Sequence, residues 1–321
     1  QIDPESYDIN ALLGKTYIDA REFKKAITPI GHARKQRPND LSMIELTAKC
    51  YRNLNETSSL ASLLKEWITL DPKRYDIKME LGSLCLNQQD IDNALIYLQD
   101  AVTFLPLEAR PHILLAQAYE LSGKDSLRLM HLDKASKLTQ DSWELNYQYA
   151  RYFVSKNKTN DAEIQFRKVL TFKPEHAPSH FELGLINIDK RNYPEALSRL
   201  QTAVRSDGTN PLYHAAAGYA YALNEQYTNA QSSIDMALQM PSQNPNVYLY
   251  ASHIYRLSND KIKALDYINK ALKINPDYAK AYEFLGDLNL EAFNFKEASK
   301  NYFLSWEKGG YNPVRALKLG N

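Results

Sequence analysis

Among the residues of this sequence that could do chemistry, two histidines have the spacing closest to that of a metal site. His176 and His180 lie four residues apart, which could place two metal ligands on one face of a helix. The segment that contains them crosses a predicted helix start, and no third ligand lies at a fixed spacing. His112, His180 and His214 share one place in the repeating pattern described below. We therefore interpret them as packing residues at the contacts between helices and predict no metal site.

Patterns typical of catalysis are missing from the sequence. Asp90-Ile91-Asp92 lacks the glycine and the downstream glutamate of a calcium-binding loop. The chain has no glycine-rich phosphate loop, no nucleophile elbow and no HExxH motif. Serine, histidine and aspartate are plentiful, but no pattern orders them into a triad. We predict a protein that is not an enzyme and that needs no cofactor.

The balance of charge argues against a polyanionic partner. The 321 residues include 39 basic and 38 acidic side chains, a formal net charge of +1, and no basic run of five or six. Such a chain has no strong field to attract nucleic acid or an anionic membrane surface. The longest run of small apolar residues, 215–223, is too short to span a bilayer. Two cysteines form no disulfide framework, so cytoplasm and periplasm both remain open.

Small residues recur at a fixed period along nearly the whole chain. Three columns have successive members 34 residues apart, and most members are Gly, Ala or Ser. The first column is Gly14, Ala48, Gly82, Ala116, Ala150, Gly184, Gly218, Ser252 and Gly286. The second is Ala26, Leu60, Ala94, Arg128, Ala162, Ala196, Ala230, Ala264 and Ala298. The third is Ala33, Trp67, Ala101, Ala135, Val169, Ala203, Ala237, Ala271 and Ser305.

Each period is expected to be a pair of antiparallel helices. In 245–278, Tyr248, Ala251 and Tyr255 recur at spacings of three and four, and so do Ala264, Ile268 and Ala271 in a second stretch. Small residues let the two helices approach, and a proline often closes the second one. The closing prolines are Pro38, Pro72, Pro106, Pro174 and Pro276. The predicted units are 7–40, 41–74, 75–108, 109–142, 143–176, 177–210, 211–244, 245–278 and 279–312.

This pattern resembles the tetratricopeptide repeat family, whose helix-turn-helix unit has the same period. The resemblance implies an all-α, right-handed superhelical solenoid that forms a single domain over 1–321. Repeat two departs from it with Leu60 and Trp67 at alanine places, so we expect its helices to lie further apart. Repeat four departs with Arg128 and Gln140 at an alanine and a proline place.

The two ends of the sequence repeat the pattern of the internal junctions. Residues 1–6 match the segments that join one repeat to the next, and 313–321 match the start of a further first helix. We expect these segments to be parts of flanking repeats in a longer array. A short native cap at 313–321 is the alternative.

The resemblance places the binding surface on the concave face, which the first helix of each unit lines. The Lys/Asn/Arg set with which one subfamily clamps a C-terminal carboxylate is absent. Mixed charges, such as Glu45, Arg52 and Glu80, line the N-terminal units. Aromatic, apolar and cationic residues follow from repeat five onward, and these types dominate interface energies. The predicted groove residues are Tyr147, Arg151, Phe181, Leu212, Tyr219, Leu249, Tyr250, His253, Arg256 and Phe284.

We predict a non-catalytic scaffold or adaptor that binds a segment of another protein in this groove, without membrane insertion by this segment. A contiguous exposed apolar patch generally marks a binding surface. The alternative for the groove residues is that several of the tyrosines pack against the next repeat and expose only an edge. The alternative for the function is a structural component of a bacterial secretion, envelope or motility apparatus that acts through self-association. That second function is an analogy at the level of the fold.

Overall fold

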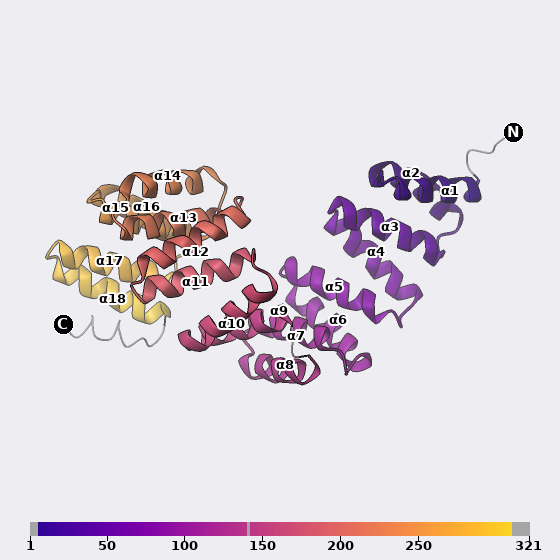
Figure 1. The fold of residues 1–321 in the computed structure, drawn as a ribbon, viewed down its shortest axis with the longest axis horizontal. Coiled ribbons are helices and arrows are strands. Elements are labelled where there is room, and N and C mark those ends of the chain that lie inside the picture. Colours follow the sequence, from indigo (N-terminus) through magenta and orange to yellow (C-terminus); the bar gives the residue numbers. More distant parts are fainter. Residues whose placement is uncertain (1–5, 140–141, 310–321) are drawn as a thin grey trace. The chain divides into compact units, whose positions relative to one another are not determined.

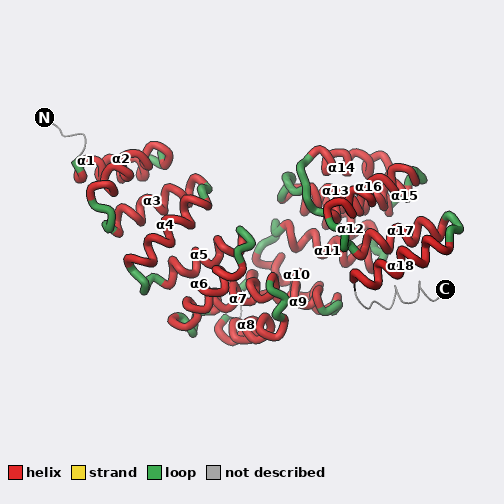
Figure 2. The backbone as a smooth tube through the Cα atoms, turned by 180° about the vertical axis from the view of Figure 1, so that it is seen from behind, coloured by secondary structure: helices red, strands yellow, loops and turns green. Residues whose placement is uncertain are grey.

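The computed structural model describes residues 6–139 and 142–309, which are helical and contain no strand (Figure 2). Gln140, the flanking segment 313–321 and most of 1–6 lie outside the described residues. The described residues form eighteen helices that alternate as first and second members of nine pairs. The prediction of an all-α solenoid of antiparallel helix pairs is thus confirmed for this part of the chain.

The first helices of the pairs begin 34 residues apart, and they begin at the first residues of the predicted units. They are α1 (Tyr7–Asp19), α3 (Leu41–Leu54), α5 (Tyr75–Asn87), α7 (Ala109–Leu121), α9 (Trp143–Ser155), α11 (Ala177–Asp189), α13 (Pro211–Leu223), α15 (Pro245–Leu257) and α17 (Ala279–Glu291). Asp40, Asn210 and Asn244 precede three of them and accept hydrogen bonds from their first backbone N–H groups. These N-caps satisfy donors that have no partner within the helix.

The second helices follow after short turns. They are α2 (Phe23–Gln36), α4 (Thr57–Leu70), α6 (Ile91–Phe104), α8 (Asp125–Leu138), α10 (Thr159–Phe172), α12 (Tyr193–Ser206), α14 (Tyr227–Gln239), α16 (Lys261–Ile274) and α18 (Phe295–Gly309). Pro38, Pro72, Pro106, Pro174 and Pro276 each stand two residues beyond the end of a second helix, as predicted.

The chain divides into two compact units, Gln1–Tyr152 and Phe153–Asn321. Within each unit, consecutive helices pack against one another, so that every second helix also contacts the first helix of the next pair (Figure 1). First helices of neighbouring pairs touch as well, most closely α13 and α15 in the second unit. The predicted single domain over the whole chain stays a prediction.

Small residues in the three columns set how closely the helices approach. All members of the columns are buried, and most of the alanines have no exposed surface. The closest approaches occur at glycines of the first column. A Cβ atom on Gly82 would lie 2.6 Å from Leu98 Cγ, and one on Gly286 would lie 2.4 Å from Tyr302 Cε1. The second helix therefore places a large side chain where the first helix has none.

Repeat two follows a different arrangement, because Leu60 and Trp67 occupy two of the small-residue places. Both side chains are buried, at 5% and 1% exposure. The backbones of α3 and α4 come close at fewer points than those of the other pairs that lie within one unit. The prediction that these two helices lie further apart is confirmed.

The turn inside each pair contains one residue in the left-handed conformation. It stands at the fifteenth place of every repeat, with φ between 56° and 68°. The nine residues are Arg21, Asn55, Gln89, Gly123, Asn157, Arg191, Glu225, Asn259 and Phe293. A left-handed residue at this point ends the first helix and redirects the chain. Glycine, which takes this conformation without strain, occurs at one of the nine.

None of the described helices is long and apolar enough to cross a membrane.

The contacts around two glycines predict that substitution by valine changes the free energy of unfolding strongly at one and little at the other. In Gly184→Val, the new Cβ would lie 2.5 Å from Leu200 Cγ in a packed helix pair. We expect the free energy of unfolding to fall by about 1–3 kcal/mol, as in other overpacked cores. Gly31→Val is the matched control, because a Cβ at Gly31 meets no atom within 4 Å. Urea denaturation followed by circular dichroism should show a change below about 0.5 kcal/mol for this control. Equal effects of the two substitutions would contradict the packing argument.

Candidate functional site

The predicted groove residues of the second unit form a continuous row of aromatic contacts. The Tyr219 ring stacks on Tyr250, with centroids 5.6 Å apart, and lies 5.0 Å from the ring of His253. His253 meets Phe284 edge to face at 4.7 Å. The Arg256 guanidinium lies over the same Phe284 ring, at 5.4 Å. Side chains from α13, α15 and α17 are thus held together across three consecutive repeats.

Burial divides these residues into two groups. Phe181, Leu249 and Phe284 are buried, with exposures of 7%, 6% and 2%. Leu212, Tyr219, Tyr250, His253 and Arg256 are half-buried. This arrangement agrees with the alternative stated for the groove residues, in which several tyrosines pack against the next repeat and expose only an edge. Phe181, Leu249 and Phe284 therefore offer little area to a partner and instead support the half-buried side chains.

Desolvation also acts on the ionisable groups of this face. Burial raises the pKa of the Tyr219 and Tyr250 hydroxyls and of the Asp189 carboxyl above their ordinary values. Protonated phenols remain hydrogen-bond donors over the whole physiological range. The face can therefore offer aromatic surface and hydrogen-bonding groups to a partner.

Arg256 is partly committed to another interaction. Its Nη1 atom lies 3.4 Å from Glu291 Oε1, and Lys261 approaches the other oxygen of that carboxylate at 4.0 Å. The Arg256 side chain is 24% exposed and that of Glu291 is 44% exposed. Because solvent screens an ion pair of this kind, it contributes at most about 1 kcal/mol.

Tyr147 and Arg151 lie on α9 in the first unit, beside an ionic network. Arg151 Nη2 is 3.0 Å from Glu120 Oε1, and Arg128 Nη2 approaches the same oxygen at 3.3 Å. The Arg151 guanidinium lies 6.0 Å from the centre of the Tyr147 ring. Two guanidinium groups thus share one carboxylate.

Arg128 has an environment that its place in the pattern explains. It occupies an alanine place of the second column, is 1% exposed, and donates to the backbone oxygen of Gln148 at 3.3 Å. Burial lowers the pKa of its guanidinium, and the neighbouring Glu120 opposes this shift. The repeat pattern singles out Arg128 in the sequence, because arginine replaces the usual alanine there. Nothing in the pattern singles out its partner Glu120.

All three histidines at the fourth place of a repeat bind the turn that precedes their helix. His180 Nε2 lies 2.7 Å from the carbonyl oxygen of Pro174, and His214 Nε2 lies 2.9 Å from that of Gly208. Tyr282 makes the corresponding bond to Pro276 with its hydroxyl, at 3.0 Å. These hydrogen bonds give the histidines a structural role at the turn before their own helix. Among the described residues, no group of three His, Cys, Asp or Glu side chains could hold a metal ion.

His112 forms an additional contact with a second buried histidine. Its Nδ1 atom lies 2.8 Å from Nδ1 of His131, and its ring also hydrogen-bonds the backbone of Pro106. Proline offers only a carbonyl, so His112 donates through Nε2 and its Nδ1 accepts from His131. Burial lowers the pKa of both rings, that of His131 to about 4. Both are therefore neutral at pH 7.

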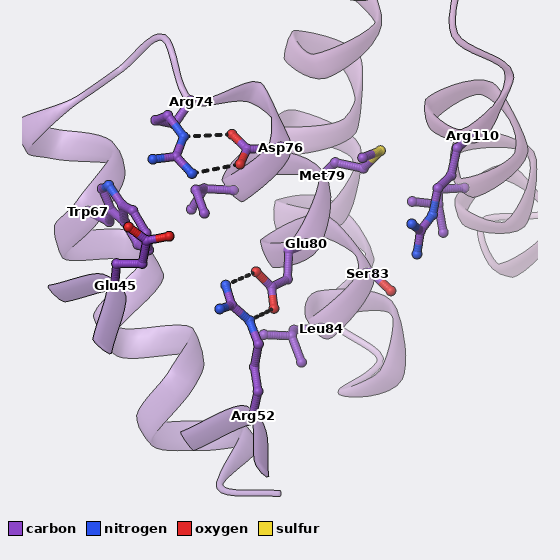
Figure 3. Close-up of a pocket in the computed structure, with 12 residues that line it drawn as sticks. Glu45, Arg52, Trp67, Arg74, Asp76, Met79, Glu80, Ser83, Leu84 and Arg110 are labelled. Atoms are coloured by element: carbon purple, nitrogen blue, oxygen red, sulfur yellow. Dashed lines mark hydrogen bonds and ion pairs between the residues drawn. The ribbon is translucent and has the colours of Figure 1, made fainter. Parts of the chain in front are cut away.

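A hollow of about 600 Å³ lies on the first unit between α3, α5 and α7 (Figure 3). Glu45, Arg52 and Glu80, which belong to the mixed-charge surface predicted for the N-terminal units, line it. Trp67, Arg74 and Arg110 line it as well. None of the ten predicted groove residues borders this hollow.

Repeated antiparallel helix pairs joined by short turns define a helical solenoid protein. Residues 181–245 and 245–278 each match a model of the tetratricopeptide repeat family. These matches and the eighteen helices of the described residues fit a tetratricopeptide repeat protein. Such proteins are generally non-catalytic scaffolds, and they typically bind protein or peptide partners.

Known proteins with similar sequence or structure agree with this class. Superkiller protein 3 of Schizosaccharomyces pombe is 24% identical in an alignment of length 247 that covers 70% of this chain. The match spans only 17% of that relative's length. The structure of the APC/C hetero-tetramer Cut9–Hcn1 has a TM-score of 0.67 at 14% identity, over 88% of this chain and 56% of that chain. A tetratricopeptide repeat protein from Parabacteroides merdae has a TM-score of 0.58 at 18% identity, over 77% and 97%. These structural likenesses concern the fold.

The histidine pair makes the stability of repeat four depend on pH. The folded-state pKa of His131 lies near 4, below the ordinary value of 6.5, so the unfolded chain binds a proton first as the pH falls. The stabilisation is complete above about pH 6.5 and decreases toward pH 4, by up to about 3 kcal/mol. Hydrogen exchange of the α7 and α8 amides, corrected for intrinsic rates, should show this loss.

Two variants test the assignment to His131. His131→Leu should flatten the pH dependence of exchange in α7 and α8. His32→Leu, which replaces an exposed histidine of α2, should leave it unchanged. Protection in α7 and α8 that is equal at pH 7 and pH 5 in the unsubstituted chain would contradict the prediction.

Proposed function

We propose that the chain is a non-catalytic adaptor that binds an extended or helical segment of another protein on its first-helix surfaces. In the second unit the contacts are made by Leu212, Tyr219, Tyr250, His253 and Arg256. In the first unit Tyr147 and Arg151 offer a corresponding pair of side chains. The observation that carries the proposal is the row of aromatic contacts in which the half-buried rings of Tyr219, Tyr250 and His253, on α13 and α15, join the buried Phe284 of α17.

Stacking prepares this row for binding. A tyrosine that is free in solution loses rotamer freedom when a partner covers it, which weakens association. Tyr219, Tyr250 and His253 are already fixed by their mutual contacts, so that cost has largely been met in the free chain. Rigid aromatic side chains of this kind are the usual anchors of protein interfaces.

Phe181, Leu249 and Phe284 have a supporting role in the proposal. Their burial fixes the backbone and the rings above them, as Phe284 does beneath His253 and Arg256. Substituting these three residues would disturb the fold, whereas substituting the half-buried residues would mainly remove contact area.

The two arginines allow the surface to accept an acidic side chain. Arg256 and Arg151 each pair with a carboxylate of this chain, Glu291 and Glu120, while remaining partly exposed. An exposed pair contributes little free energy, so a partner carboxylate can share the guanidinium at small cost. We therefore expect the bound segment to combine apolar and acidic side chains.

Site-specific photo-crosslinking in the source cells tests the proposal. With a benzophenone amino acid at Tyr219, and separately at Arg256, we expect crosslinks to a shared partner protein. The matched control carries the same group at Ile96, which is 60% exposed on the second helix α6. That position should give no crosslink to the shared partner.

A variant in the same cells completes the test. Tyr147→Ala combined with Tyr219→Ala and Tyr250→Ala should reduce recovery of the partner at least tenfold, since truncated interface anchors typically cost 2 kcal/mol or more, on the order of a 30-fold loss. Circular dichroism and the unfolding midpoint establish that the variant is folded. Undiminished recovery with a folded triple variant would refute the proposal.

A further inference from the structure

The turn inside each repeat has two places that are exposed throughout the chain. The fifteenth place is the left-handed residue of the turn, and the eighteenth is the second residue of the second helix. All nine residues at each of these places are exposed, in internal repeats as well as in the first and the last. Neighbouring repeats therefore cover neither place.

Repeats eight and nine differ from the others by large apolar side chains at these places. In the first seven repeats the two places hold polar residues, one glycine and one proline. In the last two they include Ile262, which is 84% exposed, and Phe293, which is 79% exposed. Phe295 is 63% exposed and meets the Phe293 ring edge to face, with centroids 6.4 Å apart. We call Ile262, Phe293 and Phe295 the edge patch.

The two turns that carry the edge patch are neighbours in the second unit (Figure 1). Lys261 Nζ lies 4.0 Å from one oxygen of Glu291, and Arg256 Nη1 lies 3.4 Å from the other. These contacts tie the end of α17 to the turn between α15 and α16. Ile262 follows Lys261 directly, and Phe293 stands two residues after Glu291. The apolar side chains of both repeats therefore lie along one edge, and such patches generally mark an interaction surface.

Phe303 and Trp306 are exposed for a different reason. They lie on α18, and Phe303 holds the twenty-fifth place of its repeat. At that place Gln99 and Gln201 hydrogen-bond to tyrosine hydroxyls of the following repeat. A following repeat thus covers this face elsewhere in the chain, whereas α18 is the last helix described. The exposure of Phe303 and Trp306 therefore indicates no surface of its own.

The charges beside the edge patch are compensated within the chain. Three carboxylates pair with basic side chains of the same edge. The pairs are Asp260 with Lys263, Glu291 with Lys261 and Arg256, and Glu297 with Lys300. Lys296 is exposed and makes no salt bridge with another described residue. An anionic lipid surface attracts clusters of uncompensated basic residues, which this edge lacks. Balanced charge does allow the patch to meet a second copy of itself without strong repulsion.

We propose that the edge patch is a self-association surface through which two copies of this chain form a dimer. In a two-fold arrangement the same patch serves both copies, so Ile262, Phe293 and Phe295 of one copy pack on those of the other. The unpaired Lys296 can then meet a carboxylate of the second copy. The surface consists of turns and does not include the first-helix face, so the inference goes beyond the proposed adaptor function and does not depend on it.

Sedimentation velocity of the purified full chain tests the inference without any partner protein. The patch comprises few side chains, so we expect a reversible dimer with a Kd on the order of 1–100 µM, at the weak end of specific interfaces. Because the contact is apolar, raising the salt concentration from about 0.1 to 1 M should not weaken the dimer.

A triple variant removes the patch while keeping residues that this fold accepts. Its changes are Phe293→Asn, Phe295→Lys and Ile262→Thr, which copy Asn259, Lys261 and Thr228 from the same places of other repeats. We expect the dimer to weaken at least about 30-fold, as when interface anchors are truncated. An unchanged unfolding midpoint in circular dichroism establishes that the variant is folded. The control is Leu107→Thr, which alters a leucine of the first unit that is 82% exposed and should change the Kd less than about twofold.

A crosslink locates the contact. Cys50 and Cys85 are buried, so an introduced surface cysteine should react selectively. Asn294→Cys lies between the two phenylalanines of the patch, and a short bismaleimide should join two copies through it. Asn55→Cys, at an equally exposed turn of repeat two, should give no crosslinked dimer.

Three results would overturn the inference. The first is a chain that stays monomeric up to about 1 mM, far above the expected Kd. The second is a dimer that Phe303→Gln abolishes and the triple variant leaves intact, which would place the contact on the end face of α18. The third is sedimentation with vesicles of phosphatidylcholine and phosphatidylserine that the triple variant loses, which would assign the patch to a lipid surface.

Discussion

Two helices can bury their apolar faces against each other only if their backbones come close, and in this chain small side chains at three places of each repeat set that distance. The rule is strict enough that glycines of α5, α11 and α17 face Leu98, Leu200 and Tyr302 without room for another carbon. Two residues that break this rule, Trp67 and Arg128, lie beside polar features. Trp67 separates α3 from α4 beside a charged hollow, and Arg128 reaches from α8 to the carboxylate of Glu120. Two of the departures from the packing columns thus lie beside charged clusters of the first unit.

The two units use their first helices in different ways. In the second unit the aromatic side chains contact one another, so their rings are already ordered. In the first unit the corresponding places hold charged residues whose ion pairs leave a hollow between them. Aromatic rings contribute to binding mainly through contact area, whereas charged side chains select partners of complementary charge.

The helices and their order could be predicted from the sequence because three signals agree. The 34-residue period, the columns of small residues and the prolines after the second helices all indicate the same local geometry. The accessibility of groove residues could not be predicted in the same way. Phe284 and Tyr250 both belong to the predicted lining, yet Phe284 is buried, since exposure depends on what the next repeat places over each ring. The contact between His112 and His131 was equally hidden, because the pattern does not show which polar side chains of the two helices face each other. The left-handed turns did have a partial signal in the sequence, because four of the nine places hold Asn or Gly. The residues at the other five places resemble ordinary loop composition.

The left-handed residue at the fifteenth place has a consequence for how such an array diversifies. Nine turns share one backbone conformation, yet they carry six residue types, from glycine to phenylalanine. A non-glycine residue in this conformation costs roughly 1–2 kcal/mol, and the flanking helices absorb that cost in eight of the nine turns. When a repeat is copied, its backbone path is therefore inherited intact while the exposed residue at the turn is free to drift. The row of turns can acquire new surface chemistry, one repeat at a time, without altering the frame that holds the rest of the chain.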